Sequence, residues 1–299
     1  MPAIIILLIC IILLINNSQL VIQGATEGLL LWYKNVLPLL LPFMLISGLL
    51  EEAVIKQCNQ KTKNKSSLPV FSVIFMGLFC GYPIGAKSSS FFLKQGLIDK
   101  RRANIILPVV NNVSPMFFIG FIIENTLNNK INIHTAYTIV YLPYIIFITL
   151  ELILTHHKKR AISSYQNTYI IPVSQANTTQ SKSISENSIS QITFVGLYIM
   201  LCSIVSEFIF HSNLFDTTIK LILVGATEIT RGVVQISQTS LMNEQIKTAL
   251  ILACTSFGGI SSILQTNKVI QDSGLSLLHY IFVKLLCAIG SFYLCILII

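Results

Sequence analysis

The chain has 299 residues, 53% of them hydrophobic and only 11% charged, with a formal net charge of +8 at pH 7. About a quarter of the residues of an ordinary soluble domain are charged. These figures, with a mean hydropathy of +0.74, argue against a soluble protein and predict a polytopic membrane protein in a lipid bilayer. Positive charge then marks cytoplasmic loops, and we expect no nucleic-acid partner.

The first third of the chain contains an unusual apolar segment. Residues 3–15 and 28–50 predict ordinary membrane helices, but residues 68–96 carry a Gly-Tyr-Pro-Ile-Gly break at their centre. As a helix, the arm at 69–80 would be about 18 Å long, which reaches only the middle of a bilayer core of about 30 Å. Basic residues flank both ends, so we predict a re-entrant hairpin, with one long span as the alternative.

The next apolar segment, residues 103–123, is interrupted by Pro108 and Pro115 and predicts a broken helix. Non-helical backbone at membrane depth is tolerated only where protein or a water-filled cavity surrounds it. Residues 136–154 then predict a span. The polar stretch at 156–190 predicts a cytoplasmic linker.

The second half contains four further apolar segments. They cover residues 191–210, 214–235, 246–265 and 277–299. Glu207 lies near the end of one segment and is expected at the membrane interface. The predicted fold is therefore an all-α membrane protein with seven or eight membrane segments, including re-entrant or broken helices, in two halves at 1–155 and 191–299.

A repeated tetrapeptide suggests that the two halves are related. Gly-Ala-Thr-Glu occurs at 24–27 and again at 225–228, and in each half it precedes a glycine-broken segment, at 79–81 and at 257–259. Broken segments in corresponding positions of two halves indicate a transporter binding site. The charge pattern leaves open whether such halves would be parallel or inverted.

The candidate solute-binding residues lie at these breaks and at charges within the spans. They are Gly81, Tyr82, Pro83, Gly85, Lys87, Asn111, Asn112, Ser114, Glu228, Ser261, Ser262, Gln265 and Lys284. Glycine lets the backbone approach a ligand, and the helix that starts beyond it presents free N–H groups that bind anions. The alternative is that the glycines only permit close packing and that Lys87 extends toward the interface.

The other polar candidates also have two interpretations each. Asn111, Asn112 and Ser114 either bind solute or an ion, or cap freed backbone groups. Glu228 and Arg231 share a helical face, which predicts an internal ion pair, with proton coupling as the alternative. Lys284 has no carboxylate nearby in the sequence, so it is expected to hold an anionic solute or to pair with Glu228.

Catalytic and metal-binding patterns are missing from the sequence. There is no H-E-x-x-H, no G-x-S-x-G and no P-loop, and the seven cysteines form no C-x-x-C pair. We therefore expect neither an enzyme nor a cofactor nor a metal site.

Four stretches, at 36–43, 81–87, 111–117 and 257–265, resemble in the same order the motifs of the YlbJ/SpoVV family of sporulation membrane proteins. That family carries the Gate or nucleoside-recognition domain, so the resemblance implies two Gate-like halves. It also implies transport of dipicolinate, a small aromatic dicarboxylate, during spore formation, in a bacterial cell membrane such as the outer forespore membrane. Val113 departs from the pattern, standing where the family has a small residue.

The sequence thus predicts a transporter for a small anionic solute. A nucleoside or ion transporter of the same superfamily is one alternative. Another is a non-transporting assembly protein that docks an envelope partner or a second copy of the chain.

Overall fold

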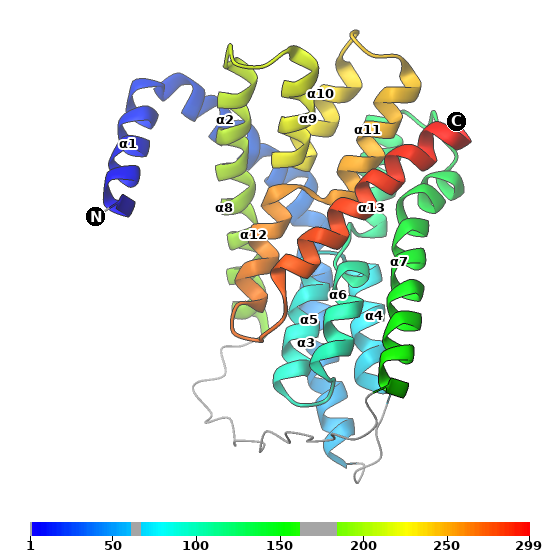
Figure 1. Ribbon diagram of the computed structural model, residues 1–299. Coiled ribbons are helices and arrows are strands. Elements are labelled where there is room, and N and C mark those ends of the chain that lie inside the picture. Colours follow the sequence, from blue (N-terminus) through cyan, green and yellow to red (C-terminus); the bar gives the residue numbers. More distant parts are fainter. Residues whose placement is uncertain (1, 61–66, 162–183) are drawn as a thin grey trace.

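The protein is a bundle of helices in the computed structural model, which describes residues 2–60, 67–161 and 184–299 (Figure 1). Two short stretches, η1 and η2, have π-helical turns. The elements in chain order are α1 (Pro2–Asn16), α2 (Ser18–Leu31), η1 (Trp32–Val36), α3 (Leu37–Gln60), α4 (Leu68–Cys80), α5 (Ile84–Lys94), α6 (Lys100–Val110), η2 (Phe117–Thr126), α7 (Ile133–Ala161), α8 (Ile184–His211), α9 (Thr217–Thr227), α10 (Ile229–Gln238), α11 (Glu244–Phe257), α12 (Gly259–Ile270) and α13 (Leu277–Ile298).

Several of these helices are built to face lipid. Within the described ranges, five segments are long and apolar enough to span a bilayer: Ser18–Cys58, Ile133–Leu154, Ser188–His211, Glu244–Ile270 and Leu277–Ile298. Leu278 and Leu297 on α13 are each 80% exposed, which suits a hydrocarbon surrounding. The all-α membrane prediction is confirmed. The predicted count of seven or eight membrane segments is not, because several expected segments consist of shorter helices.

Four of the shorter helices form two hairpins. α4 and α5 pack on each other around the turn at 81–83, which agrees with the hairpin predicted at 68–96. α9 and α10 also pack on each other, and the two hairpins lie in opposite halves of the bundle (Figure 1). Helices of 10 to 13 residues are about 15–20 Å long, roughly half of a bilayer core.

The second hairpin corrects the sequence-based prediction of one continuous segment at 214–235. Glu228 has extended backbone, with φ of −141° and ψ of 117°, so it ends α9. Its carboxylate accepts a hydrogen bond from the backbone N–H of Arg231 at 2.9 Å and thereby caps α10. A side-chain cap of this kind stabilises a helix start without glycine or proline at the break.

Two longer helical runs are broken in their middle. The run of α6 and η2 is interrupted at 111–114, as predicted from its prolines and asparagines. The run of α11 and α12 is interrupted where Gly258 and Gly259 take φ values of 84° and 79°. Both glycines lie in the left-handed region that side-chain-bearing residues rarely adopt.

The predicted linker at 156–190 is only partly open to description. α7 continues to Ala161 and α8 begins at Ile184, so its two edges are helical. The remainder of that prediction lies outside the described residues.

Close backbone approach holds the α4–α5 hairpin against α6. A β-carbon at Gly85 would lie 2.1 Å from the carbonyl oxygen of Val110, and one at Gly77 would lie 2.4 Å from the same atom. Neither contact leaves room for a side chain. The glycines of the hairpin therefore serve helix packing, which was the alternative interpretation of Gly85.

Gly85→Ala is predicted to destabilise the protein by about 1–3 kcal/mol, because the new methyl group would overlap a backbone carbonyl. Gly120→Ala is the matched control, since no atom lies within 4 Å of a β-carbon there. Thermal unfolding of the purified protein in detergent measures the difference. Equal transition temperatures for the two variants would contradict the packing described.

Candidate solute-binding site

The four chain breaks meet in the middle of the bundle. The backbone N–H of Tyr82 donates to the carbonyl of Asn112 at 2.7 Å. A β-carbon at Gly81 would lie 2.5 Å from Ser114 N, and one at Gly259 would lie 3.2 Å from the carbonyl oxygen of Thr227. The tip of each hairpin therefore touches one of the two broken helices.

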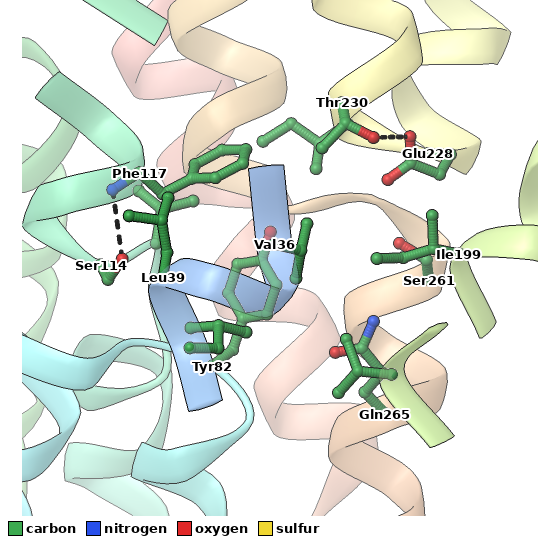
Figure 2. A pocket seen from close by; sticks show the side chains of 14 residues that line it. Val36, Leu39, Tyr82, Ser114, Phe117, Ile199, Glu228, Thr230, Ser261 and Gln265 are labelled. Atoms are coloured by element: carbon green, nitrogen blue, oxygen red, sulfur yellow. Dashed lines mark hydrogen bonds between the residues drawn. The ribbon is translucent and has the colours of Figure 1, made fainter. Parts of the chain in front are cut away.

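A pocket lies between these breaks (Figure 2). The space between its lining atoms, with open solvent at the mouth included, is about 450 Å³, and the cavity volume proper is about 30 Å³. The lining residues are Val36, Leu39, Leu40, Tyr82, Val113, Ser114, Phe117, Val195, Ile199, Glu228, Ile229, Thr230, Ser261 and Gln265. A mostly apolar wall with a few converging polar groups is typical of small-molecule sites.

Glu228 is the charged side chain of this lining, as far as the described residues define it. Its Oε2 accepts hydrogen bonds from the Arg231 backbone N–H, at 2.9 Å, and from the Thr230 hydroxyl. These two bonds fix the carboxylate at the start of α10. Among the described residues, the pocket lining therefore contains one held carboxyl group and no lysine or arginine.

Gln265 is the group most ready to bind a ligand. Its side chain is 3% exposed, and its Oε1 has no hydrogen-bond partner among the described residues. Ser261 precedes it by one helical turn on α12, so both side chains face the pocket together. Because buried polar atoms are nearly always paired, the free carbonyl of Gln265 is suited to accept a hydrogen bond from a solute.

The structure brings five of the predicted site residues to this pocket: Tyr82, Ser114, Glu228, Ser261 and Gln265. The other predicted residues lie behind the lining. The hydroxyl of Ser262 donates to the carbonyl of Gly259 at 2.9 Å and stabilises the first turn of α12. Gly81 and Pro83 form the backbone of the α4–α5 turn and are buried.

Lys87 does not line the pocket. Its ammonium lies 3.7 Å from a carboxylate oxygen of Glu51 on α3, and the Ser88 hydroxyl donates to the same carboxyl group at 2.8 Å. The lysine therefore ties α5 to α3 in this structure.

Asn111 stabilises the helix break at 111–114 and is not one of the residues that line the pocket. Its Oδ1 accepts a hydrogen bond from the backbone N–H of Ala86 at 3.1 Å and so caps α5. Its amide nitrogen donates to the Thr266 hydroxyl at 2.7 Å and to the Tyr280 hydroxyl at 3.0 Å. One side chain thereby connects the first hairpin to α12 and α13.

Lys284 reaches the same break from α13. Its buried ammonium donates to Oδ1 of Asn112 at 2.6 Å and lies 5.3 and 5.9 Å from the ring centres of Tyr144 and Tyr280. The predicted pairing with Glu228 is wrong. Amide oxygen and aromatic faces surround this cation instead, which are weaker partners than a carboxylate but still favourable ones.

The predicted Glu228–Arg231 ion pair is also wrong. The Arg231 guanidinium contacts Glu207, and it lies 3.1 Å from a carboxylate oxygen of Glu27. Glu228 uses its carboxylate at the start of α10, so the arginine side chain extends to α8 and α2. Glu207 is completely buried there.

Sequence reasoning missed the apolar lining and Thr230. Val36, Leu39 and Leu40 come from segments that look like ordinary apolar spans, so composition does not separate them from lipid-facing neighbours. The described residues bring together no three His, Cys, Asp or Glu side chains that would hold a metal ion.

Long apolar helices with exposed apolar faces define this chain as an integral membrane protein. It is 27% identical over 113 residues to the sporulation integral membrane protein YlbJ of Bacillus subtilis (strain 168), a match that covers 36% of this chain and 28% of that protein. No protein-family model matches the chain. No solved structure matches it either. The relationship to a sporulation membrane protein is therefore distant and partial.

Lys284→Met is predicted to destabilise the protein by about 1–3 kcal/mol, because the buried Oδ1 of Asn112 would lose its charged donor. Lys94→Met, at an exposed position at the end of α5, is the matched control. Denaturation in detergent, followed by circular dichroism, measures both. A Lys284→Met variant as stable as the control would show that the ammonium is not needed at this break.

Proposed function

We propose that the protein is a membrane transporter that binds a small solute between the tips of the α4–α5 and α9–α10 hairpins. The observation that carries the proposal is the pocket at the meeting point of four helix breaks. Transporters build their sites from discontinuous helices, because non-helical backbone at membrane depth must be buried or line a cavity. The proposal assigns no catalytic step to the chain.

We further propose that the two halves are related by an inverted repeat. The first half has a span, a hairpin, a broken helix and a span: α3, α4–α5, α6 to η2, and α7. The second half has the same order in α8, α9–α10, α11 to α12, and α13, with the hairpin at the other end of the bundle (Figure 1). The turn at 81–83 then corresponds to Glu228, and the break at 111–114 to Gly258. This correspondence replaces the one between 79–81 and 257–259.

The charge of the pocket favours a solute without negative charge. Glu228 and the Oε1 of Gln265 are hydrogen-bond acceptors, and the rings of Tyr82 and Phe117 lie on the same lining (Figure 2). A flat ring that carries several O–H or N–H donors would match this arrangement. A nucleoside has these features and is the leading candidate.

Dipicolinate is the second candidate, and two observations favour it. The distant relative is a sporulation protein, and α12 begins beside the pocket at a position without a side-chain cap, where a helix N-terminus attracts anions. A dianion would also lie close to Glu228, so this candidate requires that carboxyl group to be protonated. In a spore-forming cell the outer forespore membrane would be the corresponding location.

Gln265→Ala is predicted to weaken solute binding about tenfold, since one hydrogen bond in a buried site is worth about 1–1.5 kcal/mol. The test measures binding of uridine and of dipicolinate to the purified protein by calorimetry. Asn267→Ala, an exposed change on the same helix, is the matched control. Binding of neither solute to the wild-type protein, or equal effects of the two substitutions, would contradict the assigned site.

Glu228→Gln distinguishes the two candidate solutes. If the carboxylate accepts hydrogen bonds from uridine, its loss weakens uridine binding about tenfold or more, because bonds to charged groups are worth about 1.5–3 kcal/mol. Dipicolinate binding would instead become tighter, because a negative charge is removed. Glu52→Gln, an exposed change on α3, is the control. Unchanged affinity for both solutes would exclude Glu228 from the site.

A further inference from the structure

The guanidinium of Arg231 joins three helices outside the pocket. Nη2 contacts a carboxylate oxygen of Glu207 on α8 and lies 3.1 Å from Oε2 of Glu27 on α2. Nη1 donates to the backbone carbonyl of Ser203 at 3.1 Å. Two carboxylates thus share one guanidinium, and the cluster carries an excess negative charge when both are ionised.

The same cluster contains several buried polar atoms without a partner. Among the described residues, Oε1 of Glu207, Nε of Arg231 and the hydroxyl oxygens of Ser203 and Ser206 make no hydrogen bond. Glu207, Ser203 and Ser206 are fully buried, and Arg231 is 5% exposed. Four unpaired atoms around one ion pair are unusual, because buried polar groups are nearly always satisfied. The cluster therefore has the donors and acceptors to take up water or a proton.

A titratable side chain connects this cluster with the surface. Nδ1 of His211 lies 3.1 Å from Oε1 of Glu207 and 3.2 Å from the backbone carbonyl oxygen of the same residue, and the histidine side chain is 45% exposed at the end of α8. This end of α8 and the loop between α5 and α6 lie at opposite ends of the bundle (Figure 1). Histidine changes its charge near neutral pH more readily than other side chains.

The cluster is also coupled to the pocket. The backbone N–H of Arg231 donates to Glu228, so the arginine belongs to the helix turn that forms the pocket wall. A β-carbon at Gly232 would lie 2.1 Å from the Cα of Gly225, which means that α9 and α10 pack too closely to slide independently. A force on Arg231 is therefore transmitted to the whole hairpin.

We propose that Glu207 is the proton-coupling site of the transporter. The Nδ1–H bond of the His211 imidazolium breaks and an O–H bond forms at Oε1 of Glu207, which leaves a neutral imidazole and a neutral carboxylic acid. The acid no longer attracts the guanidinium, and Arg231 remains paired with Glu27. This weakens the link between the α9–α10 hairpin and α8, although the hydrogen bond of Arg231 to the Ser203 carbonyl remains, and it lets the hairpin move relative to the first hairpin.

The charged groups around Glu207 support this assignment. They are Arg231 from α10, His211 from α8 itself and Glu27 from α2, which reaches the cluster through the arginine. α3, α9, α12 and η1 also pack on α8, and their described residues contribute no ion pair to Glu207. A single proton therefore decides whether the arginine binds one or two carboxylates.

The first experiment does not require a solute. Infrared spectra of the purified protein are recorded during acid titration, and the carboxylic acid C=O band of Glu207 is identified by its loss in Glu207→Gln. We expect a band that grows as the pH falls and that is absent from this variant. Glu52→Gln, at an exposed position, should leave it unchanged. Identical spectra for the wild type and Glu207→Gln would overturn the proposal.

The second experiment rests on the proposed function and uses proteoliposomes with a gradient of one pH unit. Wild-type protein should accumulate uridine or dipicolinate up to about tenfold, the limit for one proton per solute. Glu207→Gln should bind and exchange solute but fail to accumulate it. Binding without proton-driven accumulation in the wild type would overturn the coupling site alone. Absence of binding would overturn the proposed function, and the infrared result would still decide the proton site.

His211→Gln tests the proposal even if Glu207→Gln does not fold. The histidine is about half exposed, so its substitution should leave the protein folded. We expect proton-driven uptake to be several-fold slower while solute binding is unchanged. His134→Gln, an exposed change at the start of α7, is the matched control. Uptake as fast as in the control would contradict a proton route through His211.

Discussion

The fold depends on how backbone groups are satisfied where helices stop inside an apolar bundle. Each freed N–H or carbonyl at such depth costs several kcal/mol unless it finds a partner. The first hairpin solves this by donating the Tyr82 N–H to the Asn112 carbonyl and by the Asn111 cap on α5. The second hairpin uses the Glu228 carboxylate. The pocket is the space left between these hydrogen-bonded helix breaks.

The need to pair buried polar groups also distinguishes charged side chains with a structural role from those that could contact a solute. Lys284 holds Asn112, Lys87 holds Glu51, and Arg231 holds two further carboxylates, so all three cations lie behind the pocket wall. Among the charged side chains that the structure describes, Glu228 is the one that both caps a helix and faces the cavity. For this reason we infer the chemistry of the solute from Glu228 and Gln265, which line the pocket, and not from Lys87 and Lys284, which do not.

The sequence predicts a hairpin when its breaks contain glycine or proline and its flanks are basic, as at 68–96. It does not predict the hairpin at Glu228, because a carboxylate cap within a semi-apolar segment resembles a buried ion pair. Tyr82, Ser114 and Gln265 could be predicted as site residues because they are polar at or beside breaks. The places of Lys87 and Lys284 could not, since each depends on a partner that is distant in the chain, Glu51 or Asn112.

The central claim is that a solute binds where the four breaks meet. Its most direct test is a cysteine introduced as Ser261→Cys in a variant without the native cysteines, labelled by a water-soluble thiol reagent in membranes. The account predicts that the position is labelled and that uridine or dipicolinate protects it in a concentration-dependent manner. Labelling that proceeds at the same rate with and without both solutes would contradict it.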